Sequence, residues 1–503
     1  MTAQLLSGDL HDDALTAQVH PRDWRNPIPK DRYHLVVIGA GTGGLVTAAA
    51  AAGLGAKVAL VERHLMGGDC LNVGCVPSKA VISAARAWHG AREAAARFGG
   101  PVVSGPGDFA AAMERMRRLR AGLSPIDGAA RFRALGVDVF LGEGRFTGRD
   151  TVAVGDHVLR FRRAVIATGA RAGVPPIPGL AEAGFLTNET VFTLTTLPRR
   201  LAVIGAGPIG CELAQAFRRF GAEVTLVDAA PRLLPRDDED AAALLADQLV
   251  SEGIHLVTSA RVLGVARVGD WRELSLEHPS GPLRLAVDEV LVAAGRRPNL
   301  EGLGLDQAGI AATPTGITVD DRLRTTNPAV YAVGDVCSRF QFTHSADFQA
   351  RLVVQNALFF GRARASRLVT PWCSYTSPEV AQVGLTAAEA TAQGVAHDVV
   401  QVGVEHLDRA VLEDETRGFA KVVLARGSDR ILGATIVGAD AGDLIGEVTL
   451  AMTSGLGLGA IGRTMHPYPT RGEILRKAAD AWRRGKLTPT VRRLFSTWFR
   501  IFR

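Results

Sequence analysis

Two cysteines five positions apart are the residues in this chain best suited to chemistry. Cys70 and Cys75 lie within the segment 67–79, which reads GGDCLNVGCVPSK. In a regular helix, such residues are separated by about 7.5 Å along the axis, whereas a disulfide needs Cα atoms within about 7 Å. A bond between them therefore requires a loosened turn, which Gly74 can supply. A strained disulfide is easily reduced, so the spacing predicts a redox-active pair.

The alternatives are two unrelated buried thiols or half of a metal site. The chain has no second Cys or His pair with zinc-like spacing. We therefore predict no resident metal ligands.

The composition is that of an ordinary globular enzyme. With 503 residues the chain is expected to hold about three domains, and 47% hydrophobic with 21% charged residues is typical. Five cysteines, an odd number, argue against a secreted disulfide scaffold and favour the cytoplasm. The net charge of +6 is modest and no nucleic-acid-binding motif is present, so no nucleic-acid partner is predicted.

A glycine-rich turn precedes the cysteines. The segment 35–56 is uncharged and long enough to cross a bilayer. However, Gly39, Gly41 and Gly44 follow its apolar start directly, and a second apolar run, 58–61, ends at Glu62. This pattern predicts a strand, a tight turn, a helix and a second strand. The glycines let a pyrophosphate approach the backbone at the helix N-terminus, and Glu62 is expected to accept hydrogen bonds from a ribose.

The same pattern recurs in the middle of the chain. An apolar run over 201–204 leads into Gly205, Gly207 and Gly210, and the next strand ends at Asp228. Two dinucleotide folds suggest two dinucleotides that exchange electrons. Asp228 favours NADH because it binds a ribose 2′-hydroxyl and repels a 2′-phosphate, whereas the nearby Arg232 can accommodate that phosphate, which leaves NADPH as the alternative.

Three further strand ends complete the dinucleotide-binding pattern. Thr168 and Gly169 close the strand 164–166, and Gly295 repeats this feature after the second dinucleotide fold. The buried strand 330–333 ends at Asp335, which is expected to bind a ribityl hydroxyl; the alternative is an ordinary turn residue. The first 30 residues are polar and are expected to form a loosely ordered extension, not a signal peptide.

These motifs, in this order, resemble the pyridine nucleotide–disulfide oxidoreductases over about residues 33–485. This is the family of dihydrolipoamide dehydrogenase, glutathione reductase and mercuric reductase. The resemblance implies an α/β fold with two Rossmann-like dinucleotide-binding domains, for FAD and NAD(P), and a C-terminal α+β dimerisation domain. The implied division is an extension (1–32), an FAD domain (33–185 and 300–369), an NAD(P) domain (186–299), an interface domain (370–485) and a basic amphipathic tail (486–503). FAD, NADH or NADPH, and a homodimer are implied with it.

The resemblance also assigns roles to single residues. It makes Cys75 the thiol next to the flavin and Cys70 the thiol that meets the acceptor. Lys79 and Glu212 resemble the family's ion pair near the flavin, although a surface lysine and a helical acid are the alternative. The residues expected to bind the two dinucleotides are Gly39, Gly41, Gly44, Glu62, Arg63, Gly68, Thr168, Gly169, Gly205, Gly207, Gly210, Asp228, Gly295 and Asp335.

One C-terminal motif departs from the disulfide reductases. Many of them carry His-Pro-Thr-x-x-Glu, with histidine as the acid/base, whereas this chain has Tyr468 at that position and Glu473 at the last. Tyrosine titrates near pH 10, which makes it a poor base at neutral pH. His466, two positions away, is a possible substitute only if the backbone differs.

Mercuric reductases resemble this chain in having a tyrosine at that position. The segments 342–351 and 207–212 also resemble that branch. The chain lacks that enzyme's vicinal cysteine pair in its tail and a Cys-x-x-Cys domain at its start. Cys337 and Cys373 are expected to be core thiols.

The C-terminal part alternates apolar and polar residues. The segments 418–424 and 431–438 predict antiparallel strands. The tail 491–503 places its apolar residues on one helical face with arginines mostly opposite. Such a helix can lie in a membrane interface, which suggests a peripheral position on the inner face of the membrane; docking on the dimer is the alternative.

The predicted function is therefore an FAD-dependent NAD(P)H oxidoreductase with a redox-active Cys70–Cys75 disulfide. A mercuric-reductase-like enzyme of this kind would reduce a thiophilic metal ion of the Hg(II) type or a small disulfide-type acceptor. One alternative is a dihydrolipoamide-dehydrogenase-like disulfide reductase. The other is a membrane-associated redox sensor or electron-transfer partner.

Overall fold

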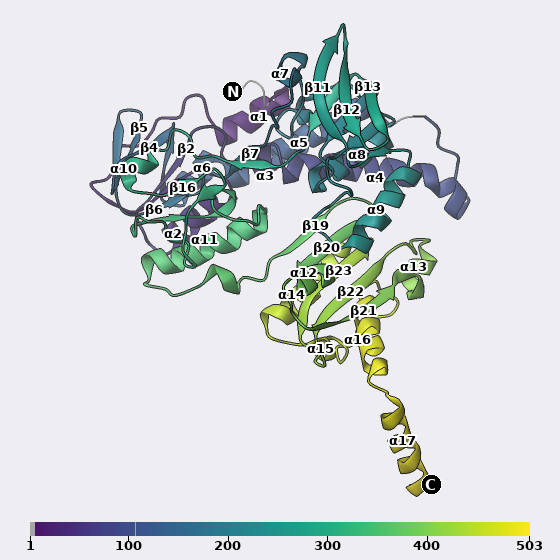
Figure 1. The fold of residues 1–503 in the computed structure, drawn as a ribbon. Helices are drawn as coiled ribbons and strands as arrows, with labels where there is room; N and C mark the ends of the chain where they lie inside the picture. Colours follow the sequence, from purple (N-terminus) through teal and green to yellow (C-terminus); the bar gives the residue numbers. More distant parts are fainter. Residues whose placement is uncertain (1–5, 106, 503) are drawn as a thin grey trace. The chain divides into compact units, whose positions relative to one another are not determined.

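The first of two compact units is built on a seven-stranded sheet. The computed structural model describes residues 6–105 and 107–502. The first unit comprises the chain up to Arg92, Val103–Ala229 and Val257–Leu368. Its larger sheet has the order β3-β2-β1-β6-β5-β4, and β18 pairs with β6 (Figure 1). These strands are β1 (Tyr33–Ile38), β2 (Val58–Glu62), β3 (Val137–Leu141), β4 (Gly144–Gly148), β5 (Thr151–Val154), β6 (His157–Ile166) and β18 (Val330–Ala332).

The parallel centre of this sheet follows from the strand–helix–strand sequence. β1 pairs in parallel with β2 and β6, and α2 (Thr42–Gly53) connects β1 to β2. Alternate side chains of β1 enter different cores. Leu35 and Val37 pack with residues of α2 and of α11 (Thr343–Leu358), whereas Val36 and Ile38 pack on the opposite face with β4–β6. The predicted βαβ unit is confirmed.

Further helices of this unit include α3 (Gly68–Asn72) and α4 (Cys75–Phe98), which carry the two cysteines. The unit also contains α5 (Phe109–Asp127), α6 (Ala129–Ala134), α7 (Leu180–Ala183) and α10 (Leu305–Ala308). Two-stranded pairings join β7 (Ala170–Ala172) to β15 (Arg296–Pro298) and β16 (Ala312–Thr313) to β17 (Gly316–Ile317).

The second dinucleotide pattern forms a four-stranded sheet of its own. Its order is β10-β9-β8-β14, with β8 (Arg200–Ile204) paired in parallel with both neighbours, β9 (Glu223–Val227) and β14 (Glu289–Val292). β10 is His255–Val257, and α8 (Pro208–Phe220) connects β8 to β9. A separate antiparallel sheet, visible as three long strands in Figure 1, comprises β11 (Arg261–Val268), β12 (Trp271–His278) and β13 (Gly281–Val287).

The second compact unit comprises Glu93–Val102, Ala230–Leu256 and Val369–Arg503. It contains a five-stranded antiparallel sheet of order β19-β20-β23-β22-β21. The strands are β19 (Pro371–Ser374), β20 (Glu379–Gly384), β21 (His397–Gly403), β22 (Phe419–Ala425) and β23 (Ile431–Gly438). The helices are α9 (Glu239–Ser251), α12 (Ala387–Ala392), α13 (Asp408–Leu412), α14 (Ala441–Thr453), α15 (Leu458–Ile461), α16 (Glu473–Gly485) and α17 (Pro489–Ile501). The two antiparallel strands predicted for this part are confirmed as β22 and β23.

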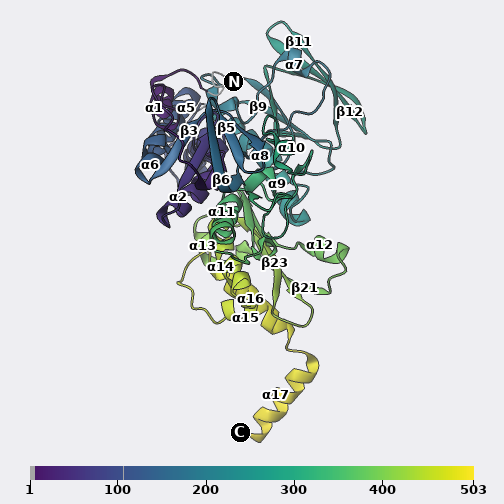
Figure 2. The same ribbon diagram turned by 90° about the vertical axis from the view of Figure 1, so that its left-hand side faces the viewer.

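The expectation of a loosely ordered N-terminal extension is wrong for residues 10–19. Residues 10–19 form the helix α1 (Leu10–Val19), which lies beside α5 in both views (Figures 1 and 2). The helix is stable because Leu15 and Val19 are completely buried in the core of the first unit. The polar residues that suggested disorder include Asp9, whose carboxylate caps the helix.

The C-terminal tail forms the helix α17, as predicted, with no buried residue. Residue 503 lies outside the described part of the chain. Among the described residues, no helix combines the length and apolar character needed to cross a membrane.

Candidate active site

The turn after β1 is closed by backbone contacts that only glycine permits. A Cβ on Gly39 would lie 2.4 Å from the carbonyl oxygen of Ala167, and a Cβ on Gly44 would lie 1.8 Å from that of Gly39. Gly39 also has a φ of +102°. Gly68 approaches this turn as closely, since a Cβ on it would lie 2.6 Å from the Cα of Gly41. The start of the cysteine segment is thus packed directly on the turn.

The turn after β8 repeats this geometry. A Cβ on Gly205 would lie 2.5 Å from the carbonyl oxygen of Ala293, and one on Gly210 would lie 1.9 Å from that of Gly205. Gly207 is the N-cap residue of α8, and a Cβ on it would meet no atom within 4 Å. The two predicted dinucleotide sites therefore share one construction, in which a strand, a turn without side chains and a helix N-terminus meet.

In both dinucleotide-binding patterns, the acidic residue at the end of the second strand accepts a hydrogen bond from the backbone of the glycine turn. Glu62 accepts hydrogen bonds from the backbone N–H groups of Ala40 and His64, each at 2.7 Å. Asp228 accepts one from Ala206 at 2.6 Å. Burial raises the pKa of Glu62. These bonds set the orientation of each carboxylate. The hydrogen bonds predicted between the two carboxylates and ribose remain expectations. Arg63, next to Glu62, is exposed.

The segment between the two cysteines is broken, as their spacing predicted. α3 ends at Asn72 and α4 begins at Cys75. Gly74 lies at the break, and a Cβ there would be 2.7 Å from the carbonyl oxygen of Asp69. Both cysteines are thiols in this structure; Cys70 is half-buried and Cys75 is exposed.

The two thiols differ in acidity. The hydrogen bond from Cys70 lowers the pKa of Cys75 to about 6, burial opposes this, and Thr343 and the charge of Lys79 lower it further. The Thr343 hydroxyl lies 3.3 Å from the sulfur of Cys75. The same hydrogen bond, with burial, raises the pKa of Cys70. Cys75 and Thr343 are the first residues of α4 and α11, and helix N-termini stabilise thiolates. At neutral pH, Cys75 is therefore the thiolate and Cys70 its hydrogen-bond donor.

Lys79 and Glu212 form an ion pair within the first unit. The Lys79 Nζ lies 2.7 Å from Oε2 of Glu212, whose side chain is 5% exposed. α4 contributes the lysine one turn after Cys75, and α8 contributes the glutamate. The structure thus brings together the pair that the family resemblance suggested.

The thiolate character of Cys75 gives a testable prediction. We expect the alkylation rate of Cys75 by iodoacetamide to rise with pH with a midpoint near pH 6. Lys79→Met removes a positive charge that stabilises the thiolate, so the midpoint should move to higher pH. Arg86→Met, on the same helix, is the matched control. A midpoint above pH 8 in the unsubstituted protein would contradict this assignment.

An ionic cluster beside the cysteines was missed by sequence reasoning. Arg296 Nη2 lies 2.6 Å from Oδ2 of Asp69 and 3.3 Å from Oδ2 of Asp335. Burial raises the pKa of Asp335, and the charge of Arg296 opposes this. Arg296 directly follows Gly295, which was the available signal. The predicted bond from Asp335 to a ribityl hydroxyl remains an expectation.

The strand ends near this cluster are tied together. The Thr168 hydroxyl donates to the carbonyl of Asn299, and the Asn299 side chain donates to the carbonyl of Thr168, each at 2.9 Å. Gly169 has a φ of +65° and accepts a backbone bond from Asn299 at 2.9 Å. These contacts join the segment that contains Thr168 and Gly169 to the segment that contains Asn299. The sequence predicts that both segments lie on the flavin side of the site.

The Tyr468 motif lies in the second unit. The Tyr468 side chain is 70% exposed, and its hydroxyl donates a hydrogen bond of 2.6 Å to Asp408, which raises the pKa of Tyr468. Glu473 is buried and pairs with Arg476 at 2.8 Å. The His466 imidazole lies 3.1 Å from the carboxylate of Glu447. The acid/base role considered for His466 stays an expectation.

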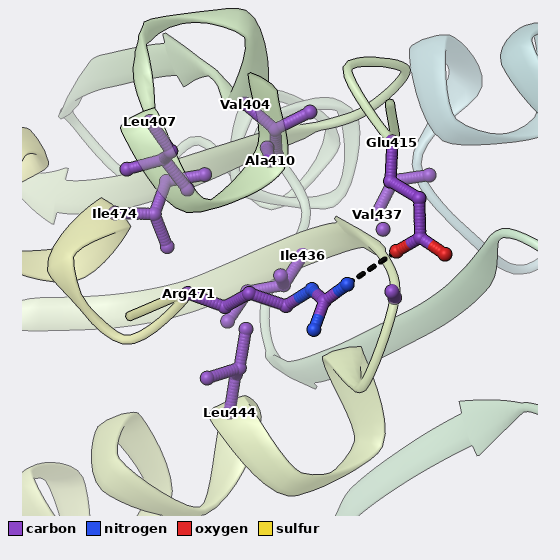
Figure 3. A pocket seen from close by; sticks show the side chains of 11 residues that line it. Val404, Leu407, Ala410, Glu415, Ile436, Val437, Leu444, Arg471 and Ile474 are labelled. Carbon is purple, nitrogen blue, oxygen red and sulfur yellow. Dashed lines mark hydrogen bonds and ion pairs between the residues drawn. The ribbon is translucent and has the colours of Figure 1, made fainter. Parts of the chain in front are cut away.

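Arg471 fixes the segment that carries Tyr468. Its guanidinium pairs with the carboxylates of Glu413, Glu415 and Asp440. Figure 3 shows the pair with Glu415 at the edge of a small pocket whose other labelled walls are aliphatic. This pocket is lined by Val404, Leu407, Ala410, Glu415, Ile436, Val437, Gly438, Ala439, Leu444, Arg471 and Ile474.

The other three cysteines, Cys211, Cys337 and Cys373, are buried or half-buried. Burial raises the pKa of Cys337 to about 12, Cys211 is buried, and Cys373 is half-buried. Within residues 6–105 and 107–502, no cluster of three His, Cys, Asp or Glu side chains is arranged to hold a metal ion.

Comparisons with known proteins agree with this construction. Residues 33–350 match the family model described as pyridine nucleotide-disulphide oxidoreductase, and residues 370–479 match the dimerisation domain of the same family. A mercuric reductase of Streptomyces lividans is 36% identical over 460 residues, covering 90% of this chain and 96% of that protein. A dihydrolipoyl dehydrogenase of Thermus scotoductus is also 36% identical, covering 89% and 97%.

Solved structures show the same fold. The HOCl-induced flavoprotein disulfide reductase RclA from Escherichia coli has a TM-score of 0.79 and 29% identity, covering 89% of this chain and 99% of its own. Its Cu(II) complex gives the same score and identity.

The chain belongs to the pyridine nucleotide–disulfide oxidoreductase family, and within it to the mercuric-reductase-like branch. It is an FAD-dependent oxidoreductase that uses NAD(P)H, with two dinucleotide-binding domains and a C-terminal dimerisation domain that supports a homodimer. The turn of Gly39, Gly41, Gly44 and Gly68 fits FAD, because it presents backbone without side chains at the N-terminus of α2, where a pyrophosphate binds. The five-part division of the chain remains a prediction.

Proposed function

We propose that this enzyme uses NAD(P)H to reduce a thiophilic metal ion of the Hg(II) type at Cys70 and Cys75. The observation that carries the proposal is the state of Tyr468. Its hydroxyl donates to Asp408, and its pKa is raised above the already high value of tyrosine. It is therefore unsuited to move protons for a disulfide acceptor at neutral pH, whereas a metal ion bound by thiolates needs no proton from it.

The chain's own residues have separate tasks in this reaction. Cys75, as the thiolate, and Cys70, its hydrogen-bonded partner, bind the metal ion through sulfur. Lys79, held by Glu212, supplies a positive charge near the thiolate. The chemistry that bound FAD supplies is two-electron transfer between the nicotinamide and the cysteine pair.

The overall reaction balances without a further reactant. NAD(P)H gives up a hydride, which is two electrons and a proton. The metal ion M²⁺ takes both electrons and leaves as M⁰, and the products besides it are NAD(P)⁺ and H⁺. The mercuric reductase relatives and a structural neighbour solved as a Cu(II) complex support a metal ion as the acceptor.

The test is an acceptor panel with the full-length holoenzyme. We expect Hg(II) with excess thiol to drive NADH oxidation, and Tyr468→Phe to leave this rate unchanged, because the reaction takes no proton from the phenol. Because a dihydrolipoyl dehydrogenase is equally similar, rapid turnover of dihydrolipoamide with none of Hg(II) would overturn the proposal. No turnover of any small acceptor would instead favour a redox sensor or electron-transfer partner.

NADH is the proposed reductant. Arg232 was the residue expected to admit a 2′-phosphate, but its guanidinium donates hydrogen bonds to the carbonyls of Leu234, Pro235 and Asp237 at 2.8–3.1 Å. Asp228 is left to repel the phosphate. We expect kcat/KM to be at least about tenfold higher with NADH than with NADPH. A preference for NADPH would contradict this.

A second proposal concerns the tail. The helix α17 exposes Leu494, Trp498 and Ile501, each more than half accessible, on one face, and the other face carries arginines. Residues 481–502 include six basic and no acidic side chains. This chemistry fits a lipid surface with anionic headgroups, because aromatic and aliphatic groups enter the interface while arginines bind the headgroups.

Vesicle flotation tests this proposal. We expect the chain to bind vesicles that contain phosphatidylglycerol, and the deletion of residues 489–503 to abolish binding without loss of NADH oxidation. Equal binding by the truncated chain, or a truncated chain that becomes monomeric, would assign the helix to something other than lipid. The cytoplasmic location, on the inner membrane face or free of it, stays a prediction.

A further inference from the structure

The helix α1 is held in place by more than packing. Asp9 caps it, accepting hydrogen bonds from the N–H groups of His11 at 3.0 Å and Asp12 at 2.9 Å. One carboxylate oxygen of Asp12 accepts bonds from the Ser7 hydroxyl at 2.7 Å and the Gly8 N–H at 3.0 Å. The segment Ser7–His20 precedes the residues matched by the family model, which begin at 33.

The other oxygen of Asp12 faces a fully buried arginine. Arg120, on α5, pairs with Asp12, and both side chains are 2% exposed. A buried charge without its partner is strongly unfavourable. The N-terminal segment therefore supplies the negative charge that permits Arg120 to lie inside the first unit.

Arg120 makes a second contact, to the cysteine segment. Its Nη1 donates a hydrogen bond of 2.8 Å to the backbone carbonyl of Asn72. Asn72 is the last residue of α3, between Cys70 and Cys75, where helical carbonyls lack intrahelical donors. The Asn72 side chain donates to the carbonyls of Met66 at 3.0 Å and Gly68 at 2.8 Å. One arginine thus ties the N-terminal helix to the break between the two thiols.

Direct contacts reinforce this link. The Met66 N–H donates to the carbonyl of Val19 at 3.1 Å, and the side chain of His20 contacts the carbonyl of His64. Leu15 and Val19 share one buried core with Met66 and Leu71. The segment 64–72 is therefore anchored on α1 at its start and, through Arg120, at its end.

We propose that the N-terminal segment Ser7–His20 positions the redox loop: Asp12, acting through Arg120 on the Asn72 carbonyl, holds the turn that keeps Cys70 and Cys75 within bonding reach. Asp12 and Arg120 are positioning residues, since neither contacts a cysteine sulfur. The inference rests on the redox role proposed for the two cysteines. Its consequence is that loss of the link lowers the effective concentration of one thiol at the other, even where the protein remains folded.

The test measures that effective concentration directly. The holoenzyme is equilibrated in glutathione redox buffers, quenched by alkylation, and the Cys70–Cys75 disulfide is quantified by mass spectrometry. The main variant, Asp12→Ala with Arg120→Met, removes both charges together, which is often tolerated, and deletes the donor to Asn72. We expect disulfide formation to fall about tenfold, equivalent to about 30 mV in potential.

Two companion variants keep the result interpretable. Asp12→Asn keeps an acceptor for Arg120 and should show a smaller decrease. Asp13→Asn, an exposed position on the same helix, should match the unsubstituted protein. A purely structural role would lower the melting temperature and leave the disulfide equilibrium unchanged, and that result in the double variant would overturn the inference.

The outcomes also separate this inference from the proposed function. If the unsubstituted protein forms no Cys70–Cys75 disulfide at any glutathione ratio, the redox role itself fails. If it forms one with the same equilibrium as the double variant, the redox role stands and only the positioning role is lost.

Discussion

Cys75→Ser is expected to abolish NADH oxidation with Hg(II), by at least ~10³-fold, or about 4 kcal/mol of transition-state stabilisation. Cys75 is the exposed thiol whose pKa is lowered to about 6 by Cys70, with Thr343 and Lys79 assisting. Serine keeps the shape of the side chain but is not a thiolate at neutral pH. Steady-state turnover and FAD content are the two measurements.

The control for this variant is Cys373→Ser. Cys373 is a half-buried thiol in the second unit and has no part in the proposed chemistry. It should keep its turnover, and both variants should retain FAD. Substantial Hg(II)-dependent turnover by Cys75→Ser with full FAD content would remove Cys75 from the reaction.

Gly44→Ala is expected to lower FAD affinity by about 100-fold. The added Cβ would lie 1.8 Å from the carbonyl oxygen of Gly39, so that the turn and the helix must separate. Overpacking of this severity costs up to about 3 kcal/mol, and each 1.4 kcal/mol is tenfold in Kd. Flavin absorbance after gel filtration, referred to protein concentration, measures the bound FAD.

Two variants separate a cofactor effect from misfolding. Gly53→Ala, at the other end of α2, meets no atom within 4 Å and should retain FAD fully. Gly210→Ala places a Cβ 1.9 Å from the carbonyl oxygen of Gly205 in the second turn. It should retain FAD but show a raised KM for NADH. Full FAD binding by Gly44→Ala would be incompatible with the glycine turn described above.

The parts of the fold that could be predicted from the sequence are those that depend on patterns of neighbouring residues. The strand predicted to end at Glu62 is β2, because apolar runs and glycine spacing act over a few residues. The break between Cys70 and Cys75 was predictable from helix geometry alone. The pair Lys79 and Glu212 was accessible only through family resemblance, since 133 positions separate the two residues.

Contacts distant in the sequence were the ones missed. The segment that forms α1 was expected to be loosely ordered because it is polar and contains acidic residues, whereas Asp12 is paired with Arg120, 108 positions away. Thr343 joins the site only because α11 begins beside Cys75. Arg296 joins it through ion pairs with Asp69 and Asp335 that depend on the tertiary fold.

The central claim is that Cys75 passes the electrons of NADH onward as a thiolate, and anaerobic titration of the holoenzyme with NADH tests it most directly. We expect a long-wavelength thiolate-to-flavin charge-transfer absorbance to appear on addition of NADH and to disappear when Hg(II) is added. Cys75→Ser should show no such absorbance. Its absence in the unsubstituted protein, or its persistence in Cys75→Ser, would contradict the account.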